Sequence, residues 1–416
     1  MKIKIITLGC KVNQYESEKI KENLIKNNFE ITNDTSAADA VLINSCAVTN
    51  MAIKKVRYDI SLSRRKNAGA KIFVLGCGAD EISKNSSLGQ VVVLNKENAD
   101  KLLNLLTEMR LNAQNRAVAT PQGKFEQNHT RNRYFIKVQD GCNNFCSYCI
   151  VPFARGREKS VPIADVLTEI SALPETIKEV VLTGINLSNY GLDIGSSLAE
   201  LCAEVDKLGR KFRLSSLEQH IITPKFLSEL TRLKNFQPSF HLCLQSGSDK
   251  TLREMNRHYT AAEFIAKTKL IREAFKNATI STDIIVGFPT ETDADFRETL
   301  AVAEKVKFAH IHIFPYSVRS GTVAEKFKQL TPSVITARVR ELTEIANKIE
   351  TEILSAHVGK TLTCLIENKN QSGYIGTSAE NFDVIIKSET PLELDFYAAK
   401  IIGVSWKKLI GEVKNA

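Results

Sequence analysis

Three cysteines at close, regular spacing are the residues of this chain best suited to chemistry. Cys142, Cys146 and Cys149 lie in the segment GCNNFCSYC and form a CxxxCxxC pattern. Iron–sulfur clusters that only carry electrons usually have four thiolate ligands, whereas a cluster with three leaves one iron open to another molecule. The alternatives are a zinc knuckle or disulfides, but structural zinc favours CxxC pairs closed by two further ligands. The spacing therefore predicts a cluster with an open iron.

Three more cysteines are expected to gather at one edge of a sheet. Short apolar runs near the start of the chain are typical of buried parallel strands, and Cys10, Cys46 and Cys77 each follow one of them. Parallel strands end at the same edge of a sheet, where such folds bind ligands. Independent buried thiols are the alternative. The remaining cysteines are expected to be ordinary buried thiols: Cys202, Cys243 and Cys364.

The pattern along the chain predicts three domains and a linker. Residues 1–113 alternate strands and helices and predict a parallel α/β sheet, and the polar stretch 114–132 predicts a linker. Six strand-like runs over 133–356, each followed by a helical stretch, predict a partial (β/α)6 barrel. Polar residues crowd the ends of these strands, where barrels form their active sites, so we expect a site for a polar small molecule there. Residues 357–416 predict a small antiparallel β-barrel, in which Trp406 is expected to pack.

Composition excludes a disordered or membrane-spanning chain. The 416 residues are 43% hydrophobic and 25% charged, and no stretch approaches ~20 consecutive apolar residues. The N-terminal segment turns polar too soon for a signal peptide, so we predict a cytoplasmic protein whose nine cysteines serve metal or redox chemistry. The net charge is +9, and basic residues concentrate over 51–71 and 110–137. These stretches suit RNA phosphates, with solvated helix faces as the alternative.

Several motifs together resemble a known enzyme family. CNNFCSYC after a strand, TGIN, a third strand bearing a glutamate, and GFP after the fifth strand resemble the radical S-adenosylmethionine enzymes. LGCKVNQYES, NSCAVTN and GCGAD extend the resemblance to the methylthiotransferases over all three predicted domains. The resemblance implies a flavodoxin-like N-terminal domain, a central radical S-adenosylmethionine barrel and a C-terminal TRAM-like barrel that binds RNA. It also implies two 4Fe-4S clusters, one on each set of three cysteines.

The resemblance further implies where S-adenosylmethionine binds and why it is needed. The cofactor would chelate the open iron of the first cluster, with Tyr148 beside its adenine. Other strand-end residues match the family's cofactor pocket: Gly184, Asn186, Ser216, Glu218, Gln245, Val286, Gly287 and Phe288. An unactivated C–H bond has no acidic proton, so its reaction requires a radical made by a strongly reducing centre. The second cluster, on Cys10, Cys46 and Cys77, would then supply a methylthio group. No catalytic residue is expected beyond the cluster ligands, and a low-potential electron donor is the expected partner.

The motif around Cys10 indicates which substrate the enzyme modifies. LGCKVNQYE resembles the branch that modifies N6-threonylcarbamoyladenosine next to the tRNA anticodon, whereas the isopentenyladenosine branch typically reads GCQMN and the branch acting on a ribosomal-protein aspartate reads GCPKN. The sequence therefore predicts 2-methylthiolation of N6-threonylcarbamoyladenosine in the tRNA anticodon stem-loop, with the other two branches as alternatives. Candidate substrate contacts are Lys11, Asn13, Arg257, Tyr316 and Arg319.

Two other classes of protein are also compatible with the cysteines. A two-cluster electron-transfer protein would leave the large barrel without a role. A zinc-stabilised RNA-binding protein would contain zinc in place of iron. His310 and His312 lie on one face of a predicted strand and are interpreted as structural histidines, not as metal ligands.

Overall fold

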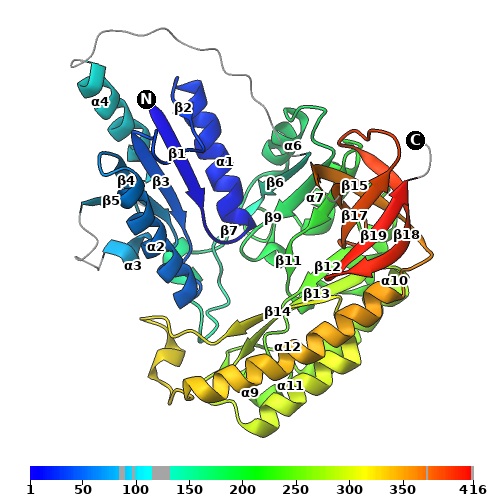
Figure 1. Ribbon diagram of the computed structural model, residues 1–416. Coiled ribbons are helices and arrows are strands. Elements are labelled where there is room, and N and C mark those ends of the chain that lie inside the picture. Colours follow the sequence, from blue (N-terminus) through cyan, green and yellow to red (C-terminus); the bar gives the residue numbers. More distant parts are fainter. Residues whose placement is uncertain (84–89, 96–98, 115–131, 372, 414–416) are drawn as a thin grey trace. The chain divides into compact units, whose positions relative to one another are not determined.

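The computed structural model describes residues 1–83, 90–95, 99–114, 132–371 and 373–413. It divides into two compact units (Figure 1). The first comprises Met1–Asn128 with two later segments, Tyr148–Arg157 and Ser317–Glu325, and the second comprises His129–Ser147, Glu158–Tyr316 and Lys326–Ala416. The predicted linker, 114–132, lies almost wholly outside the described residues. Among the described helices, none has the length and apolar character needed to cross a membrane.

The first unit contains a five-stranded parallel sheet in the order β2-β1-β3-β4-β5. This is the flavodoxin-like order, which confirms the predicted fold class. The strands are β1 (Lys2–Thr7), β2 (Glu30–Ile31), β3 (Ala40–Ser45), β4 (Lys71–Gly76) and β5 (Val91–Val93). The helices are α1 (Lys11–Lys26), α2 (Asn50–Lys66), α3 (Ala79–Ser83), η2 (Ala99–Lys101), α4 (Leu102–Gln114) and α5 (Val151–Arg155).

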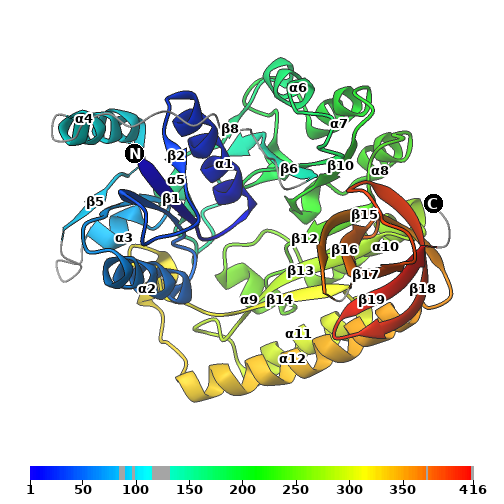
Figure 2. The same cartoon turned by 45° about the horizontal axis from the view of Figure 1, so that its top comes forward.

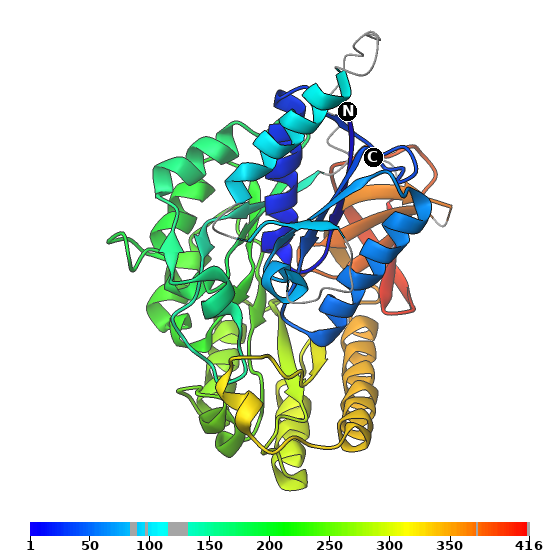
Figure 3. The same cartoon turned by 90° about the vertical axis from the view of Figure 1, so that its left-hand side faces the viewer.

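The central strand β3 is buried along its whole length because helices cover both faces of the sheet (Figure 3). Val41 and Ile43 pack in the core formed with α2 and α3, whereas Ala40 and Leu42 pack in the core formed with α1 and α4. Each fully buried valine, leucine or isoleucine side chain contributes roughly 1.5–3 kcal/mol. This double coverage explains why the strand reads as a continuous apolar run and why its polar residues are confined to its end.

The second unit contains the predicted partial barrel. Two parallel sheets, β10-β9-β6 and β11-β12-β13-β14, follow one another, and only Ser215 separates β10 from β11. The predicted third strand is therefore divided, and the six-unit barrel is otherwise as expected. Its strands are β6 (Arg133–Lys137), β9 (Glu179–Thr183), β10 (Lys211–Leu214), β11 (Ser216–Leu217), β12 (Ser239–Leu242), β13 (Thr279–Val286) and β14 (His310–Pro315).

Helices connect the barrel strands, as parallel pairing requires. They are α6 (Ile163–Ser171), η3 (Leu187–Asn189), α7 (Leu198–Asp206), η4 (Gln219–Ile221), α8 (Pro224–Thr231), α9 (Asp249–Glu254), α10 (Ala261–Ala274) and α11 (Asp293–Val306). Two further helices, η5 (Val323–Lys326) and α12 (Pro332–Ser355), follow the last barrel strand and precede the C-terminal barrel. A short antiparallel pair, β7 (Gln139–Asp140) and β8 (Lys159–Ser160), brackets the cysteine loop in the sequence.

The C-terminal residues form a closed five-stranded barrel in the order β15-β16-β17-β19-β18 (Figure 2). Its strands are β15 (Thr361–Asn370), β16 (Gly373–Ser378), β17 (Asp383–Ser388), β18 (Phe396–Ser405) and β19 (Lys408–Val413). The pairings are antiparallel except for β17 with β19. The expectation that Trp406 packs is wrong. Trp406 is 94% exposed, because it lies with Lys407 in a two-residue turn where both residues have positive φ.

A buried ionic network joins the β10-β9-β6 sheet of the second unit to the C-terminal barrel. Glu179 is fully buried and accepts hydrogen bonds from Arg213 Nε at 2.9 Å and Arg133 Nε at 2.6 Å. Arg213 also donates to the carbonyl oxygens of Ser378 and Ala379 in the barrel. Burial would raise the pKa of Glu179, but the two guanidinium groups outweigh it and hold that pKa below its usual value of 4.5.

Replacing Glu179 is expected to destabilise the second unit strongly. Glu179→Gln leaves the buried guanidinium group of Arg213 without its ion-pair partner, while the half-buried Arg133 keeps Glu367, and we expect a loss of about 3–5 kcal/mol, measured by urea unfolding at neutral pH. Glu229→Gln is the control, because Glu229 pairs with Lys225 on the surface and its loss should cost under about 1 kcal/mol. Since the pKa of Glu179 is depressed, its contribution is present above pH 4.5 and lost as the pH falls through the folded-state pKa. Equal losses in the two variants would contradict the prediction.

Candidate functional site

Cys10, Cys46 and Cys77 lie together in the first unit at the carboxyl ends of β1, β3 and β4. Cys46 directly follows β3 and Cys77 directly follows β4. Burial, with smaller contributions from Cys46 and Cys10, raises the pKa of the Cys77 thiol to about 12 even though the charge of Arg155 lowers it. Burial also raises the pKa of Cys46. Both thiols therefore stay protonated at neutral pH even with Arg155 nearby, and binding of a metal ion would be needed to ionise them.

Arg155 places a fixed positive charge beside Cys77. Its side chain is buried, and its Nε lies 2.9 Å from Cys77 Sγ. Glu16 accepts from both terminal nitrogens of Arg155, at 2.9 and 3.1 Å, and so orients the guanidinium group. Asn13 Oδ1 accepts from Arg155 at 2.9 Å and from Cys10 Sγ at 3.5 Å. Arg155 and Glu16 were not predicted from the sequence, although Arg155 follows Cys149 by only a few residues.

The predicted substrate contacts in the first unit have differing surroundings. Asn13 is buried and donates to the carbonyl oxygens of Leu8 and Ser45, so it ties two of the cysteine-bearing loops together. Arg319 is also buried, donates to Asn50 Oδ1 and Ser317 Oγ, and its charge lowers the pKa of Cys46 against the effect of burial. Lys11 is exposed at the start of α1.

Glycines let the backbone approach the cysteines closely. A Cβ on Gly9 would lie 2.8 Å from Cys46 Cβ, and one on Gly78 would lie 2.9 Å from the Cys46 carbonyl oxygen. Gly76 has φ +83°, and a Cβ there would lie 2.4 Å from Asn44 Oδ1. GCGAD therefore has a glycine on each side of Cys77 for steric reasons.

The loop that carries the CxxxCxxC pattern is anchored at several points in the second unit. Ser147 donates through its backbone N–H to Met255 O and through Oγ to Glu254 O. Asn256 Nδ2 donates to the carbonyl oxygen of Phe145, a residue held at φ +46°. Burial raises the pKa of Cys142 to about 11, and a thiolate at Cys146 would raise it further. Tyr148 and Cys149 are half-buried and are grouped with the first unit.

A second buried arginine stands beside this loop. Arg257 Nη1 lies 3.6 Å from Cys146 Sγ, and its two terminal nitrogens form a bidentate ion pair with Glu218. Arg257 also donates to Cys243 O at 3.2 Å. Glu218 was predicted to contact the cofactor and Arg257 the substrate, and the structure pairs them next to Cys146. This arrangement repeats that of Arg155, Glu16 and Cys77.

Glu158 links the cysteine loop to the end of β9. It accepts from the backbone N–H of Asn143 at 3.1 Å and from the amides of Asn186 and Asn189 at 3.0 and 2.8 Å. Asn186 Oδ1, by contrast, is buried and has no hydrogen-bond partner among the described residues. This orphaned acceptor fits a bound ligand that donates a hydrogen bond. Glu158 was not predicted, because a single glutamate in a charged segment carries no distinctive pattern.

The other predicted cofactor residues lie at the ends of neighbouring barrel strands. Gln245 has φ +68° and pairs through its backbone with β13, and Ser216 begins β11. A Cβ on Gly184 would meet Gln139 Cβ at 2.9 Å. Val286 ends β13, Gly287 has φ +78°, and the ring of Phe288 packs edge-on against Tyr316 at 5.7 Å.

The remaining cysteines and histidines differ in their surroundings. Cys202 and Cys364 are fully buried in α7 and β15, in agreement with their interpretation as ordinary thiols. His310 lies 3.1 Å from Glu350 and its ring contacts that of His312. Cys243 is also buried, and His241 and Asp283 lie next to it.

Comparisons with known proteins establish the family. Residues 136–303 match the Radical SAM superfamily, and residues 2–118 match a family described as "Uncharacterized protein family UPF0004". The chain is 34% identical over 408 residues to the threonylcarbamoyladenosine tRNA methylthiotransferase MtaB of Aquifex aeolicus, covering 93% of this chain and 98% of that protein. It is 37% identical to the protein of the same name from Thermotoga maritima, covering 88% and 86%. It is 33% identical to the tRNA-2-methylthio-N(6)-dimethylallyladenosine synthase of Fervidobacterium nodosum, covering 100% and 99%.

The chain therefore belongs to the radical S-adenosylmethionine tRNA methylthiotransferases and is an enzyme of this class. A solved structure supports the fold alone: the radical S-adenosylmethionine methyltransferase TsrM from Kitasatospora setae has a TM-score of 0.53 at 14% identity, covering 76% of this chain and 74% of that one. Membership implies S-adenosylmethionine and one 4Fe-4S cluster. Clustered thiols of raised pKa fit such a group, because iron supplies the positive charge that their thiolates need.

The geometry of Gly76 predicts a local effect of its replacement on Cys77. Gly76→Ala places a Cβ in contact with Asn44 and the Ser45 backbone, whereas Gly209→Ala has similar positive φ but open space around it. Both should lose about 1–2 kcal/mol from the left-handed backbone, and Gly76→Ala should lose more and expose Cys77 to alkylation. Urea unfolding and mass spectrometry of alkylated peptides measure these effects. Equal stability and unchanged Cys77 alkylation in the two variants would show that Gly76 has no steric role.

Proposed function

We propose that this protein converts N6-threonylcarbamoyladenosine, next to the tRNA anticodon, to its 2-methylthio derivative. It would use two 4Fe-4S clusters and S-adenosylmethionine as the source of both the methyl group and the radical. Cys142, Cys146 and Cys149 would hold the first cluster, on the basis of their spacing. Cys10, Cys46 and Cys77 would hold the second. A low-potential electron donor and a cytoplasmic location belong to the same proposal.

The convergence of Cys10, Cys46 and Cys77 is the observation that carries the proposal. They are far apart in the sequence, yet their thiols are close enough for each ionised one to raise the pKa of Cys77. Their common environment also contains a fixed guanidinium group on Arg155. Three thiols with a buried cation suit an iron–sulfur cluster that keeps one iron open, whereas a structural zinc site requires four ligands.

The chain's own residues would position and electrostatically support the cofactors. When bound, the clusters supply the electron and the methylthio group that radical methylthiolation requires. Arg155 and Arg319 would balance the negative charge of the second set of thiolates, and Arg257 that of Cys146. The buried acceptor of Asn186 would bind a donor group of S-adenosylmethionine. Positioning and exclusion of water are the protein's main contributions to such chemistry.

Exposed basic and aromatic residues support binding to tRNA. One face of α2 buries Ile53, Val56 and Ile60, while its lysines and arginines include four that are exposed: Lys54, Lys55, Arg65 and Lys66. Such cations bind phosphates with release of counterions. Tyr58 on the same helix is 58% exposed, and Trp406 of the C-terminal barrel is almost completely so. Exposed aromatic rings stack on unpaired bases, which the anticodon loop offers.

The choice of nucleoside rests on the first cysteine motif and on the relatives. Lys11 and Val12 resemble the threonylcarbamoyladenosine branch, and relatives with 34–37% identity carry that substrate in their names. Relatives named for dimethylallyladenosine reach 34% identity, so this nucleoside is the principal alternative. The ribosomal-protein aspartate is the second alternative. A protein that only transfers electrons is disfavoured, because it gives the barrel no role.

Iron analysis tests the two clusters. The protein reconstituted anaerobically with iron and sulfide should bind about eight irons per chain with matching sulfide and little zinc. Replacing Cys142, Cys146 and Cys149 by alanine should remove about half of this iron, and replacing Cys10, Cys46 and Cys77 should remove the other half. Cys202→Ala is the control and should keep all of it, because Cys202 is fully buried in α7. A colourless, zinc-filled protein, or an iron content that does not change in the second variant, would refute the two-cluster assignment.

Analysis of tRNA nucleosides tests the substrate. Expression of this chain in a bacterial strain that lacks its own methylthiotransferases for both nucleosides should produce 2-methylthio-N6-threonylcarbamoyladenosine, detected by mass spectrometry of digested tRNA. Either triple cysteine variant should produce none. Formation of 2-methylthio-isopentenyladenosine instead would assign the protein to the alternative branch. Unmodified tRNA together with a methylthiolated ribosomal-protein aspartate would overturn the tRNA proposal.

A further inference from the structure

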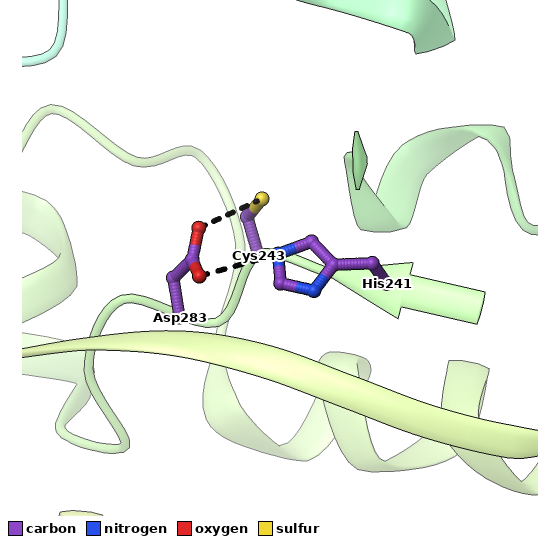
Figure 4. Close-up of side chains that lie close together, drawn as sticks. All are labelled: His241, Cys243 and Asp283. Atoms are coloured by element: carbon purple, nitrogen blue, oxygen red, sulfur yellow. Dashed lines mark hydrogen bonds and ion pairs between the residues drawn. The ribbon is translucent and has the colours of Figure 1, made fainter. Parts of the chain in front are cut away.

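We infer that His241, Cys243 and Asp283 form a binding site for a divalent transition-metal ion of the zinc class, built from none of the six cluster cysteines. One potential ligand atom from each side chain lies within 4.8 Å of the other two. His241 Nε2 is 3.3 Å from Asp283 Oδ1, and Cys243 Sγ is 3.9 Å from Asp283 Oδ2. Figure 4 shows the three side chains converging from neighbouring strands.

The backbone fixes the three residues in this arrangement. His241 lies in β12, Cys243 follows two residues later, and Asp283 lies in the parallel neighbour β13. The Cys243 carbonyl oxygen accepts from Tyr259 Oη at 3.0 Å as well as from Arg257. The next residue, Leu244, donates its N–H to the Thr282 side chain at 3.0 Å. Regular strand pairing therefore stops here, and side chains hold the end of β12.

The separations of the side-chain atoms match those of ligands around an ion, and the His241–Asp283 separation is longer than a typical direct hydrogen bond. A neutral N–H···O bond is typically about 2.9 Å, and a pair involving an ionised carboxylate is shorter still. The two separations here are 3.3 and 3.9 Å. Tetrahedral zinc, with bonds of about 2.0–2.3 Å, holds its ligand atoms roughly 3–4 Å apart. Both separations fall in that range.

The charge and the outer contacts also suit a divalent ion. A neutral imidazole, a thiolate and a carboxylate together carry the two negative charges that balance such an ion in a partly buried place. His241 Nδ1 lies 2.9 Å from Ser281 Oγ, so the other ring nitrogen, Nε2, is left facing Asp283. A hydrogen bond from the distal nitrogen is the usual orientation device for a ligating histidine. Without an ion, burial and the nearby carboxylates keep the pKa of Cys243 well above its usual value.

Three protein ligands leave one coordination position for water or another ligand. The ring of His312, which lies in the next strand β14, is 5.4 Å from the ring of His241. The ion would also fix the end of β12 and hence Gln245, two residues beyond Cys243. The inference does not depend on the nucleoside that the enzyme modifies, because the ligands are defined by their own geometry.

Cobalt binding tests the site without using clusters, S-adenosylmethionine or tRNA. In the full chain with all six cluster cysteines replaced by alanine, Co²⁺ should bind at about one per chain and give a thiolate-to-cobalt absorption band in the near ultraviolet. Cys243→Ser should abolish the band, and Asp283→Asn should weaken cobalt binding at least about tenfold. Cys202→Ser and Cys364→Ser are matched controls and should keep the band, since these cysteines are buried elsewhere.

The reconstituted holoenzyme provides a second measurement in case the six-alanine chain does not fold. After equimolar Zn²⁺ and removal of unbound metal, elemental analysis should find about one zinc beside the iron, lost in Cys243→Ser and kept in Cys202→Ser. Absence of zinc from the holoenzyme would show that His241, Cys243 and Asp283 form only a hydrogen-bonded cluster. Metal binding that persists in Cys243→Ser would place the metal elsewhere and would also overturn the inference. Loss of methylthiolation alone would bear on the proposed function and not on this site.

Discussion

A buried arginine lies beside one cysteine in each set of three, where burial works against ionisation of the thiols. Burial raises the pKa of Cys46, Cys77 and Cys142, and the nearby guanidinium groups lower the pKa of Cys46 and Cys77 without cancelling that effect. Each set of three cysteines includes one whose sulfur lies within hydrogen-bond reach of a buried arginine, itself held by a glutamate in a bidentate pair. The arrangement is the same around Cys77 and Cys146, although the surrounding folds differ. A guanidinium group cannot lose its charge in a protein, so it is a permanent partner for thiolates.

Several buried charges of the second unit are held in ion pairs. Glu179 is neutralised by two arginines that also fix the C-terminal barrel, and Glu218 is neutralised by Arg257 next to the cysteine loop. Such pairs add little stability overall, but losing one partner is costly. They are therefore suited to holding loops in one geometry. Rigid loops are what a cofactor site of this class requires, because radical chemistry depends on positioning and on exclusion of competing reactions.

Much of the fold was predictable because it follows from local patterns. Buried parallel strands read as continuous apolar runs, and their ends meet at one edge, so the convergence of Cys10, Cys46 and Cys77 followed from counting strands. The division of the third barrel strand at Ser215, the parallel pairing of β17 with β19 and the exposure of Trp406 were not predicted. These features depend on backbone dihedrals and on strand pairing between distant segments, which residue types do not specify.

The sequence by itself determined the family, the two sets of three cysteines and the order of the domains, because these are encoded in spacing and in short-range periodicity. Only the tertiary structure decided which groups stand beside the cysteines. Arg155 contacts Cys77 across 78 positions, and Asp283 contacts Cys243 across 40. Such partners are chosen by the three-dimensional path of the backbone, and a single arginine, glutamate or histidine has no pattern that reveals its partner. The spacing of the CxxxCxxC loop indicates its chemistry from the sequence alone. The charged side chains beside the cysteines are brought there only when the chain folds.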